Sequence, residues 1–98
     1  MICKEAILEM LSAHKPELSG FGVSALGLFG SYVRDEQTAD SDIDLLIDFE
    51  PGKEGFDNYM AVCALLEQIF QQERVEIVTK NGLSKYIGPA ILKEVVYV

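Results

Sequence analysis

Two aspartates, Asp42 and Asp44, stand two residues apart in an apolar stretch of the chain. On a strand, residues i and i+2 point to the same side, with Cα atoms roughly 6.5–7 Å apart. Two carboxylates at that spacing can converge on one hard cation, or on two cations a few ångströms apart. Alternating aspartates can also mark only the wet side of an edge strand. The spacing therefore predicts a candidate metal site, with a plain surface strand as the alternative.

A Gly-Ser pair, Gly30 and Ser31, ends the short apolar run 23–29. A glycine at the end of a strand lets the backbone approach a ligand closely, and the amides that follow can point at an anion. The serine hydroxyl adds a further donor for a phosphate. Gly-Ser is also a common turn dipeptide, so the pair indicates a phosphate site only in combination with other features.

A third carboxylate, Glu76, lies in the run 74–78, which predicts a further strand. If that strand pairs beside the one that carries Asp42 and Asp44, Glu76 joins them on one face and completes a cluster of three. The alternative is a salt bridge with Arg74 or Lys80 on a solvated face. The residues alone leave both interpretations open.

Hydrophobic periodicity predicts the elements that hold these residues. Apolar residues at helical spacing predict helices over about 2–13 and 58–71, and Pro16 and Gly20 end the first helical region. Strands are predicted over 23–29, 42–49, 74–78 and 95–98. The predicted fold is α/β (α+β), a small mixed sheet of three to four strands with helices packed on one face. Residues 1–98 are expected to form a single domain.

The chain carries a formal net charge of −8, so its surface on average repels nucleic acid phosphates and anionic lipid. Direct nucleic acid binding is therefore not expected. Lys4 and Glu5 interrupt the apolar N-terminus, which argues against a signal peptide or a membrane span. Cys3 and Cys63 lack the spacing of a zinc site and are expected to be small buried residues of a cytoplasmic protein.

Taken together, the Gly-Ser strand end and the Ser-Asp-x-Asp strand resemble a known signature. Their order resembles that of the DNA polymerase β-type nucleotidyltransferase superfamily, and more closely that of the minimal nucleotidyltransferases (MNT or MntA-like proteins). The resemblance covers almost the whole chain. The residues that carry it are Gly30-Ser31-Tyr32-Val33-Arg34 and Ser41-Asp42-Ile43-Asp44-Leu45-Leu46-Ile47.

The resemblance implies a polymerase β-like fold and a Mg²⁺-dependent enzyme that moves AMP from ATP to an acceptor hydroxyl. It implies that Asp42, Asp44 and Glu76 are catalytic and hold two Mg²⁺ ions, with Mn²⁺ as a substitute. It also implies a nucleotide-binding set, namely Gly30, Ser31, Arg34 and Ser41. Arg34 could neutralise phosphate charge or brace the aspartate strand, and both roles stay open.

Two positions depart from the family pattern. Asp35 stands where close relatives usually have glycine and puts a negative charge near the expected phosphate site. Glu76 stands where the minimal group usually has aspartate, which preserves the ligand chemistry but lengthens the side chain by one methylene. Both departures bear on activity.

The resemblance further implies a protein partner, a HEPN-type toxin whose tyrosine hydroxyl accepts the AMP, which makes the chain the antitoxin of the pair. One alternative is a catalytically impaired antitoxin that neutralises its partner by masking it. Another is an acidic α/β domain without a nucleotide site. The sequence leaves open whether the chain forms an oligomer with copies of itself or with a partner.

Overall fold

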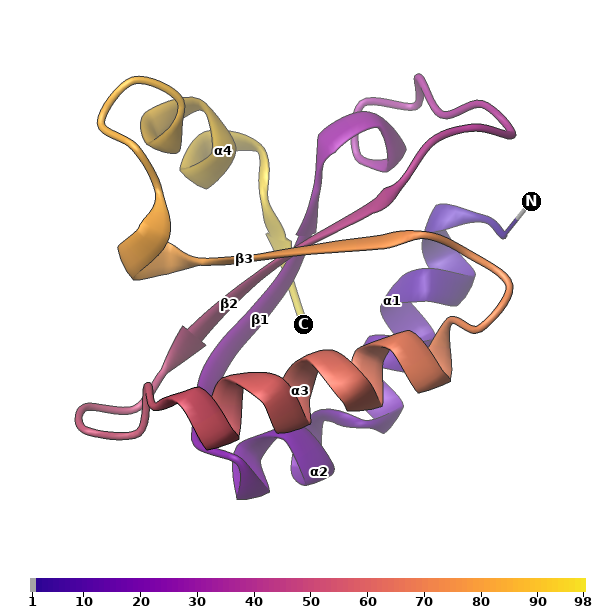
Figure 1. Ribbon diagram of the computed structural model, residues 1–98. Coiled ribbons are helices and arrows are strands. Elements are labelled where there is room, and N and C mark those ends of the chain that lie inside the picture. Colours follow the sequence, from indigo (N-terminus) through magenta and orange to yellow (C-terminus); the bar gives the residue numbers. More distant parts are fainter. Residues whose placement is uncertain (1) are drawn as a thin grey trace.

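The structure is a computed structural model that describes residues 2–98 (Figure 1). Its centre is a sheet with the strand order β3–β2–β1–β4. The strands are β1 (Val23–Phe29), β2 (Ile43–Phe49), β3 (Val75–Thr79) and β4 (Val96–Tyr97). The helices are α1 (Lys4–Ala13), α2 (Lys15–Gly20), α3 (Phe56–Ile69) and α4 (Gly88–Glu94), with short 3₁₀ turns η1 (Gly30–Tyr32) and η2 (Lys80–Gly82).

The sheet is mixed, as the sequence predicts. Strand β1 pairs antiparallel with both β2 and β4, whereas β2 and β3 run parallel. A parallel pair needs a crossover connection, and α3 supplies it between β2 and β3. In this register Asp44 lies opposite Phe29 on one side and Glu76 on the other. The pairing that would bring Glu76 beside the aspartate strand is therefore present.

Three helices, α1, α2 and α3, cover one face of the sheet (Figure 1). The side chains of β2 that point to this face are wholly buried, and they form one core cluster with apolar residues of the three helices. The alternation predicted for the strand is thus confirmed. The cluster includes Ile7, Leu11, Leu18, Ile43, Leu45, Ile47, Val62 and Leu66.

The short helix α4 lies on the opposite side of the sheet from α1, α2 and α3 (Figure 1). It covers part of that face, where Leu46 is 1% exposed. Gly27 leaves room for the chain after α4, since a Cβ at this glycine would collide with the Val95 side chain. The expectation of helices on one face thus holds for the first three, and α4 adds a partial cover on the second face.

Two local expectations are wrong. Residues around Pro16 form the additional helix α2, because proline is tolerated in the first turn of a helix, where its missing N–H would be unpaired anyway. Cys3 is exposed, because it precedes α1 instead of packing within it. Among residues 2–98, no helix is long and apolar enough to cross a membrane.

Candidate active site

The end of β1 lies against the carboxylate of Asp44. Phe29 pairs with Asp44 across the sheet, and the chain then turns at Gly30 with a φ of +80°. A Cβ at position 30 would fall on the carboxylate of Asp44. Position 30 therefore requires glycine twice, for the left-handed backbone and for the close approach. The contact between the Gly30 turn and the aspartate strand is thus built into the backbone.

Asp44 and Glu76 are direct neighbours in the parallel register of β2 and β3. Asp44 is half-buried and Glu76 is exposed. The pKa of Asp44 is raised to about 6, chiefly by burial and further by the neighbouring carboxylates of Glu76 and Asp42. The Arg34 guanidinium opposes the shift. Like charges held this close disfavour ionisation unless a cation neutralises them.

Asp42 is engaged by an arginine that precedes β3. Its Oδ1 lies 2.9 Å from Arg74 Nε, without the alignment of a hydrogen bond. Arg74 also donates from Nη2 to the carbonyl of Asp40 at 2.6 Å. The arginine considered as a partner for Glu76 thus pairs with Asp42 instead. Within residues 2–98 no three acidic, histidine or cysteine side chains are gathered closely enough to form a metal-binding group.

The donor chemistry of Asp44 and Glu76 nevertheless fits a divalent cation. Mg²⁺ in phosphoryl-transfer sites is bound through one or two carboxylates, with waters and substrate phosphates as its other ligands. Burial and, after it, the neighbouring carboxylates raise the pKa of Asp44, and a bound cation would favour its ionised form against both. Asp44 and Glu76 would hold the ion. Asp42, at the same strand end, would join them if its ion pair with Arg74 were broken.

Arg34 is held between two carboxylates. Its Nη1 donates to both carboxylate oxygens of Glu94, at 2.9 and 3.1 Å, and its Nε donates to Glu36 at 2.9 Å. The Glu94 carboxylate also accepts the backbone N–H of Gly30 at 2.7 Å. Glu94 therefore ties the end of α4 to the turn after β1. These contacts tie Arg34 to Glu36 and to α4 and do not include the aspartate strand, so both roles left open for Arg34 stay open.

Two hollows flank the Asp44–Glu76 pair. The first, which we call the α4 hollow, has a volume of about 410 Å³ and lies between the strand ends and α4. The second, the α3 hollow, has a volume of about 620 Å³ and lies beside the end of α3. Glu76 lines both. The α4 hollow includes Gly30, Arg34, Asp44, Leu83, Ile91 and Glu94, and the α3 hollow includes Asp42, Glu67, Gln71, Glu73 and Arg74.

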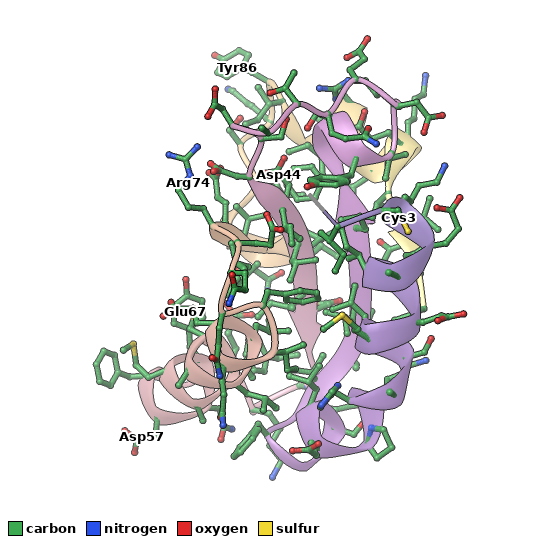
Figure 2. The ribbon with its side chains drawn as sticks, turned by 90° about the vertical axis from the view of Figure 1, so that its right-hand side faces the viewer. Cys3, Asp44, Asp57, Glu67, Arg74 and Tyr86 are labelled. Atoms are coloured by element: carbon green, nitrogen blue, oxygen red, sulfur yellow. The ribbon has the colours of Figure 1, made fainter. Side chains whose placement is uncertain are left out.

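Asp44 and Arg74 lie toward one end of the molecule, whereas Glu67, which lines the α3 hollow, lies nearer its middle (Figure 2). Figure 2 shows Asp44 near the end of the sheet where Arg74 and Tyr86 also lie. Asp57, in the first turn of α3, lies at the opposite end. The charged side chains that could act on a ligand are therefore concentrated where β1 ends and where β2 and β3 begin.

The structure does not bring all predicted site residues together. Ser31 is half-buried but is not among the residues that line the α4 hollow. Ser41 accepts the backbone N–H of Thr38 at 2.8 Å and so holds the loop before β2. Asp35 is exposed and lies 3.7 Å from Lys4 Nζ of α1, away from the α4 hollow. Its negative charge is thus offset outside the expected phosphate site.

The sequence analysis does not include Glu94 among the site residues, and it offers Arg74 only as one possible partner of Glu76, not of Asp42. The helical spacing of Ile91 and Glu94 places both on the side of α4 that faces the α4 hollow. That spacing was a usable signal for Glu94. The pairing of Arg74 depends on the loop geometry before β2, for which the sequence carries no comparable pattern.

Comparison with known proteins identifies relatives over the whole chain. The profile of the nucleotidyltransferase domain family matches residues 6–98. A protein named protein adenylyltransferase MntA, from Thermococcus cleftensis, is 41% identical over 107 residues, which cover 100% of this chain and 98% of the relative. The similarity thus includes both the predicted site residues and the C-terminal segment that carries Glu94.

Solved structures share the fold. A provisionally assigned minimal nucleotidyltransferase superposes with a TM-score of 0.81 at 28% identity, over 97% of this chain and 95% of that one. Two toxin–antitoxin structures also share it, one of a mutant MntA–HpeT pair and one with AMP-PNP. Their TM-scores are 0.63 and 0.56 at 16% and 17% identity, over 98% of this chain and 71% and 72% of theirs.

Proposed function

This chain belongs to the nucleotidyltransferase domain family, and we propose that it transfers AMP from ATP to a hydroxyl group of a protein partner. The observation that carries the proposal is the Asp44–Glu76 pair, held in register between two hollows. Glu76 lines both hollows and Asp44 lines the α4 hollow, an arrangement that suits a reaction between two substrates. The name of the 41% identical relative, a protein adenylyltransferase, supports the choice of donor group and acceptor class.

In the proposed reaction the acceptor oxygen forms a bond to the α-phosphorus of ATP. The bond from that phosphorus to the pyrophosphate oxygen breaks, and the hydroxyl proton passes to solvent. The α4 hollow would take the nucleotide, because it contains the Gly30 turn and Arg34, and its volume is within the range of small-ligand pockets. Leu83 and Ile91 would supply its apolar wall.

Magnesium is the proposed cofactor, held by Asp42, Asp44 and Glu76. When bound, divalent ions in such sites neutralise phosphate charge and activate the attacking oxygen. The chain's own contribution is to place Asp44 beside the Gly30 turn and to hold Glu76 opposite it. Glu76, although longer than aspartate, stands in the register position that lets it reach both hollows.

The α3 hollow would admit the acceptor. It opens beside Asp42 and Glu76 and is flanked by the acidic side chains of Glu67 and Glu73. An acidic rim favours an approaching segment with positive charge. We propose a tyrosine hydroxyl of a HEPN-type toxin as the acceptor, with this chain as the antitoxin, in keeping with the toxin–antitoxin structures that share the fold.

The test is label transfer from ATP labelled at the α-phosphate to the co-purified toxin in the presence of Mg²⁺. We expect the parent chain to label the partner, and the Asp42→Ala/Asp44→Ala variant to lose activity by at least about 10²–10³-fold, the usual cost of removing charge stabilisation at the reacting centre. Asp48→Asn, on the same strand but outside both hollows, is the matched control. Absence of label with the parent chain would refute the proposal.

Neutralisation by masking is the second candidate function. It is favoured by one observation, that both arginines near the strand ends are already paired with carboxylates, Arg34 with Glu94 and Arg74 with Asp42. If masking alone protects the cell, the Asp42→Ala/Asp44→Ala variant will rescue growth against the toxin as well as the parent chain does. The enzymatic proposal expects rescue to fail with this variant.

A further inference from the structure

The turn after β1 offers its hydrogen-bond donors to a carboxylate of the same chain. Glu94 Oε2 accepts the Gly30 N–H at 2.7 Å and Arg34 Nη1 at 3.1 Å, and Glu94 Oε1 accepts Arg34 Nη1 at 2.9 Å. The Glu94 side chain is 22% exposed, so its bond to the Gly30 N–H is partly shielded from water. Its bonds to Arg34, whose side chain is 49% exposed, remain open to solvent. The Glu94 carboxylate thus accepts hydrogen bonds from the Gly30 backbone N–H and from the Arg34 guanidinium at the same time.

A carboxylate and a phosphate compete for such donors. Both are anions that accept from backbone N–H groups and from arginine at similar distances. An anionic chain held at the Gly30 turn would therefore need the bonds that Glu94 now accepts. It would also lie within a few ångströms of a like charge, which is unfavourable in a half-buried hollow.

We propose that Glu94 is an intramolecular latch, a carboxylate that occupies the anion-binding donors of the Gly30 turn and must withdraw before a polyphosphate can use them. The inference rests on the proposed function for its physiological ligand, the triphosphate of a nucleotide. It adds a regulatory element, since nucleotide affinity would depend on the position of α4.

The segment that carries the latch is lightly held. Gly88 is the buried residue of α4, and β4 pairs with β1 through two residues, Val96 and Tyr97. The chain after α4 is fixed at its end by Val98, whose N–H donates to the Leu26 carbonyl at 2.9 Å and whose side chain packs against the core cluster. Both β4 residues are exposed, as is Leu92 of the helix. Segments with few buried contacts open locally at low free-energy cost. Withdrawal of Glu94 therefore needs a shift of α4 but no disruption of the core cluster on the other face.

The experiment measures binding of inorganic tripolyphosphate by calorimetry, with Mg²⁺, to the full chain and two variants. Glu94→Gln removes the latch charge while keeping the side-chain shape. Glu36→Gln removes the other carboxylate from Arg34 but leaves the Gly30 amide engaged, and it is the matched control. We expect Glu94→Gln to bind about tenfold more tightly, on the scale of one hydrogen bond to a charged group, and Glu36→Gln to stay within about twofold.

A gain in affinity is a result that damage to the fold does not produce. If Glu94→Gln does not fold by circular dichroism, Glu94→Asp replaces it, because the shorter side chain keeps the charge but loses its reach to the turn. Unchanged or weaker binding by the folded variant would overturn the latch, including the case in which neither protein binds. The AMP-transfer assay stands apart, so tighter tripolyphosphate binding without any transfer would retain the latch and reject the enzyme.

Discussion

On one face of β2, Ile43, Leu45 and Ile47 are wholly buried against α1, α2 and α3. On the other face, Asp44 lies among charged groups contributed by four separate segments, the turn after β1, the loop before β3, β3 itself and the end of α4. The two faces share a backbone and a register. They differ in what their side chains need in order to be stable.

The side chains of the apolar face need no ligand to be stable, because each one removes apolar surface of its neighbours from water. The charged face instead places Asp44 beside Glu76, while Asp42 pairs with Arg74 and Glu94 pairs with Arg34. A chain selected only for stability would not raise the pKa of a carboxylate to about 6 by burying it beside another. The difference indicates that one face specifies the fold and the other is organised for ligands.

If the two faces have separate roles, a mutation in the apolar face should lower stability without impairing AMP transfer. Leu11→Ala removes a wholly buried side chain of α1, and we expect a loss of about 2–5 kcal/mol in the free energy of unfolding. Denaturant melts will measure it. At a temperature where the variant stays folded, AMP transfer per folded molecule should change by less than about threefold, and a larger loss would show that the faces are coupled.

On the charged face we expect mutation to stabilise. Asp44 has an ordinary carboxyl pKa in the unfolded chain and a pKa of about 6 in the folded one. The folded state therefore holds more protons between these values, and stability falls as pH rises from about 4 to 6. Without divalent ions, Asp44→Asn should gain about 1–2 kcal/mol at pH 7.5, a value reduced for solvent screening, and little at pH 4.

Thermal melts of the parent and variant across that pH range will measure the effect. Asp48→Asn is the control, because it removes a charge from the same strand without removing a neighbour of Glu76. Added Mg²⁺ should raise the melting temperature of the parent more than that of Asp44→Asn, since a ligand stabilises the state that binds it. If the melting temperatures of the parent and Asp44→Asn depended on pH in the same way, ionisation of Asp44 would not destabilise the folded state.

The apolar face could be predicted from the sequence because its signal is local. Alternation over residues 43–47 and helical spacing over α1 and α3 each specify a face without reference to distant residues. Strand β1 occurs at its predicted residues, 23–29. Helix α2 was missed because Pro16 was interpreted as a helix end, although the same residue type begins helices.

The charged face was predictable only in part. The Gly30 turn, the two aspartates and Glu76 follow from strand ends and from parallel pairing, which the fold class implies. The Glu94–Gly30 and Arg74–Asp42 contacts join residues 64 and 32 positions apart, respectively. Such pairs depend on the placement of α4 and of the loop before β2. An exposed arginine has several carboxylates within reach, so its sequence neighbours do not decide its partner.

A smaller effect concerns a polar atom within the apolar face. Tyr32 is 1% exposed, and its buried hydroxyl has no hydrogen-bond partner among the described residues. An unsatisfied buried hydroxyl costs stability. Tyr32→Phe keeps the ring, so we expect a gain of about 1 kcal/mol in the free energy of unfolding. Denaturant melts will measure it, and a loss of stability would show that a water satisfies the hydroxyl.

The smallest expected effect concerns Asp35, where the backbone conformation and the side-chain charge can be tested by separate substitutions. Its φ of +58° is one that residues other than glycine adopt at a cost, although aspartate tolerates it better than most. The ion pair with Lys4, at 3.7 Å between exposed side chains, offsets little of that cost. Asp35→Gly should therefore gain about 0.5 kcal/mol of stability in denaturant melts.

Asp35→Asn tests the other half of that idea, because asparagine tolerates the same backbone conformation without the charge. We expect it to leave the affinity for Mg²⁺-ATP within about twofold of the parent, since Asp35 lies near α1 and outside the α4 hollow. Calorimetric titrations of both variants decide the matter. If removing the charge tightened nucleotide binding severalfold, Asp35 would belong electrostatically to the charged face, and the boundary between the two regions would pass through η1 and α1 instead of along β2.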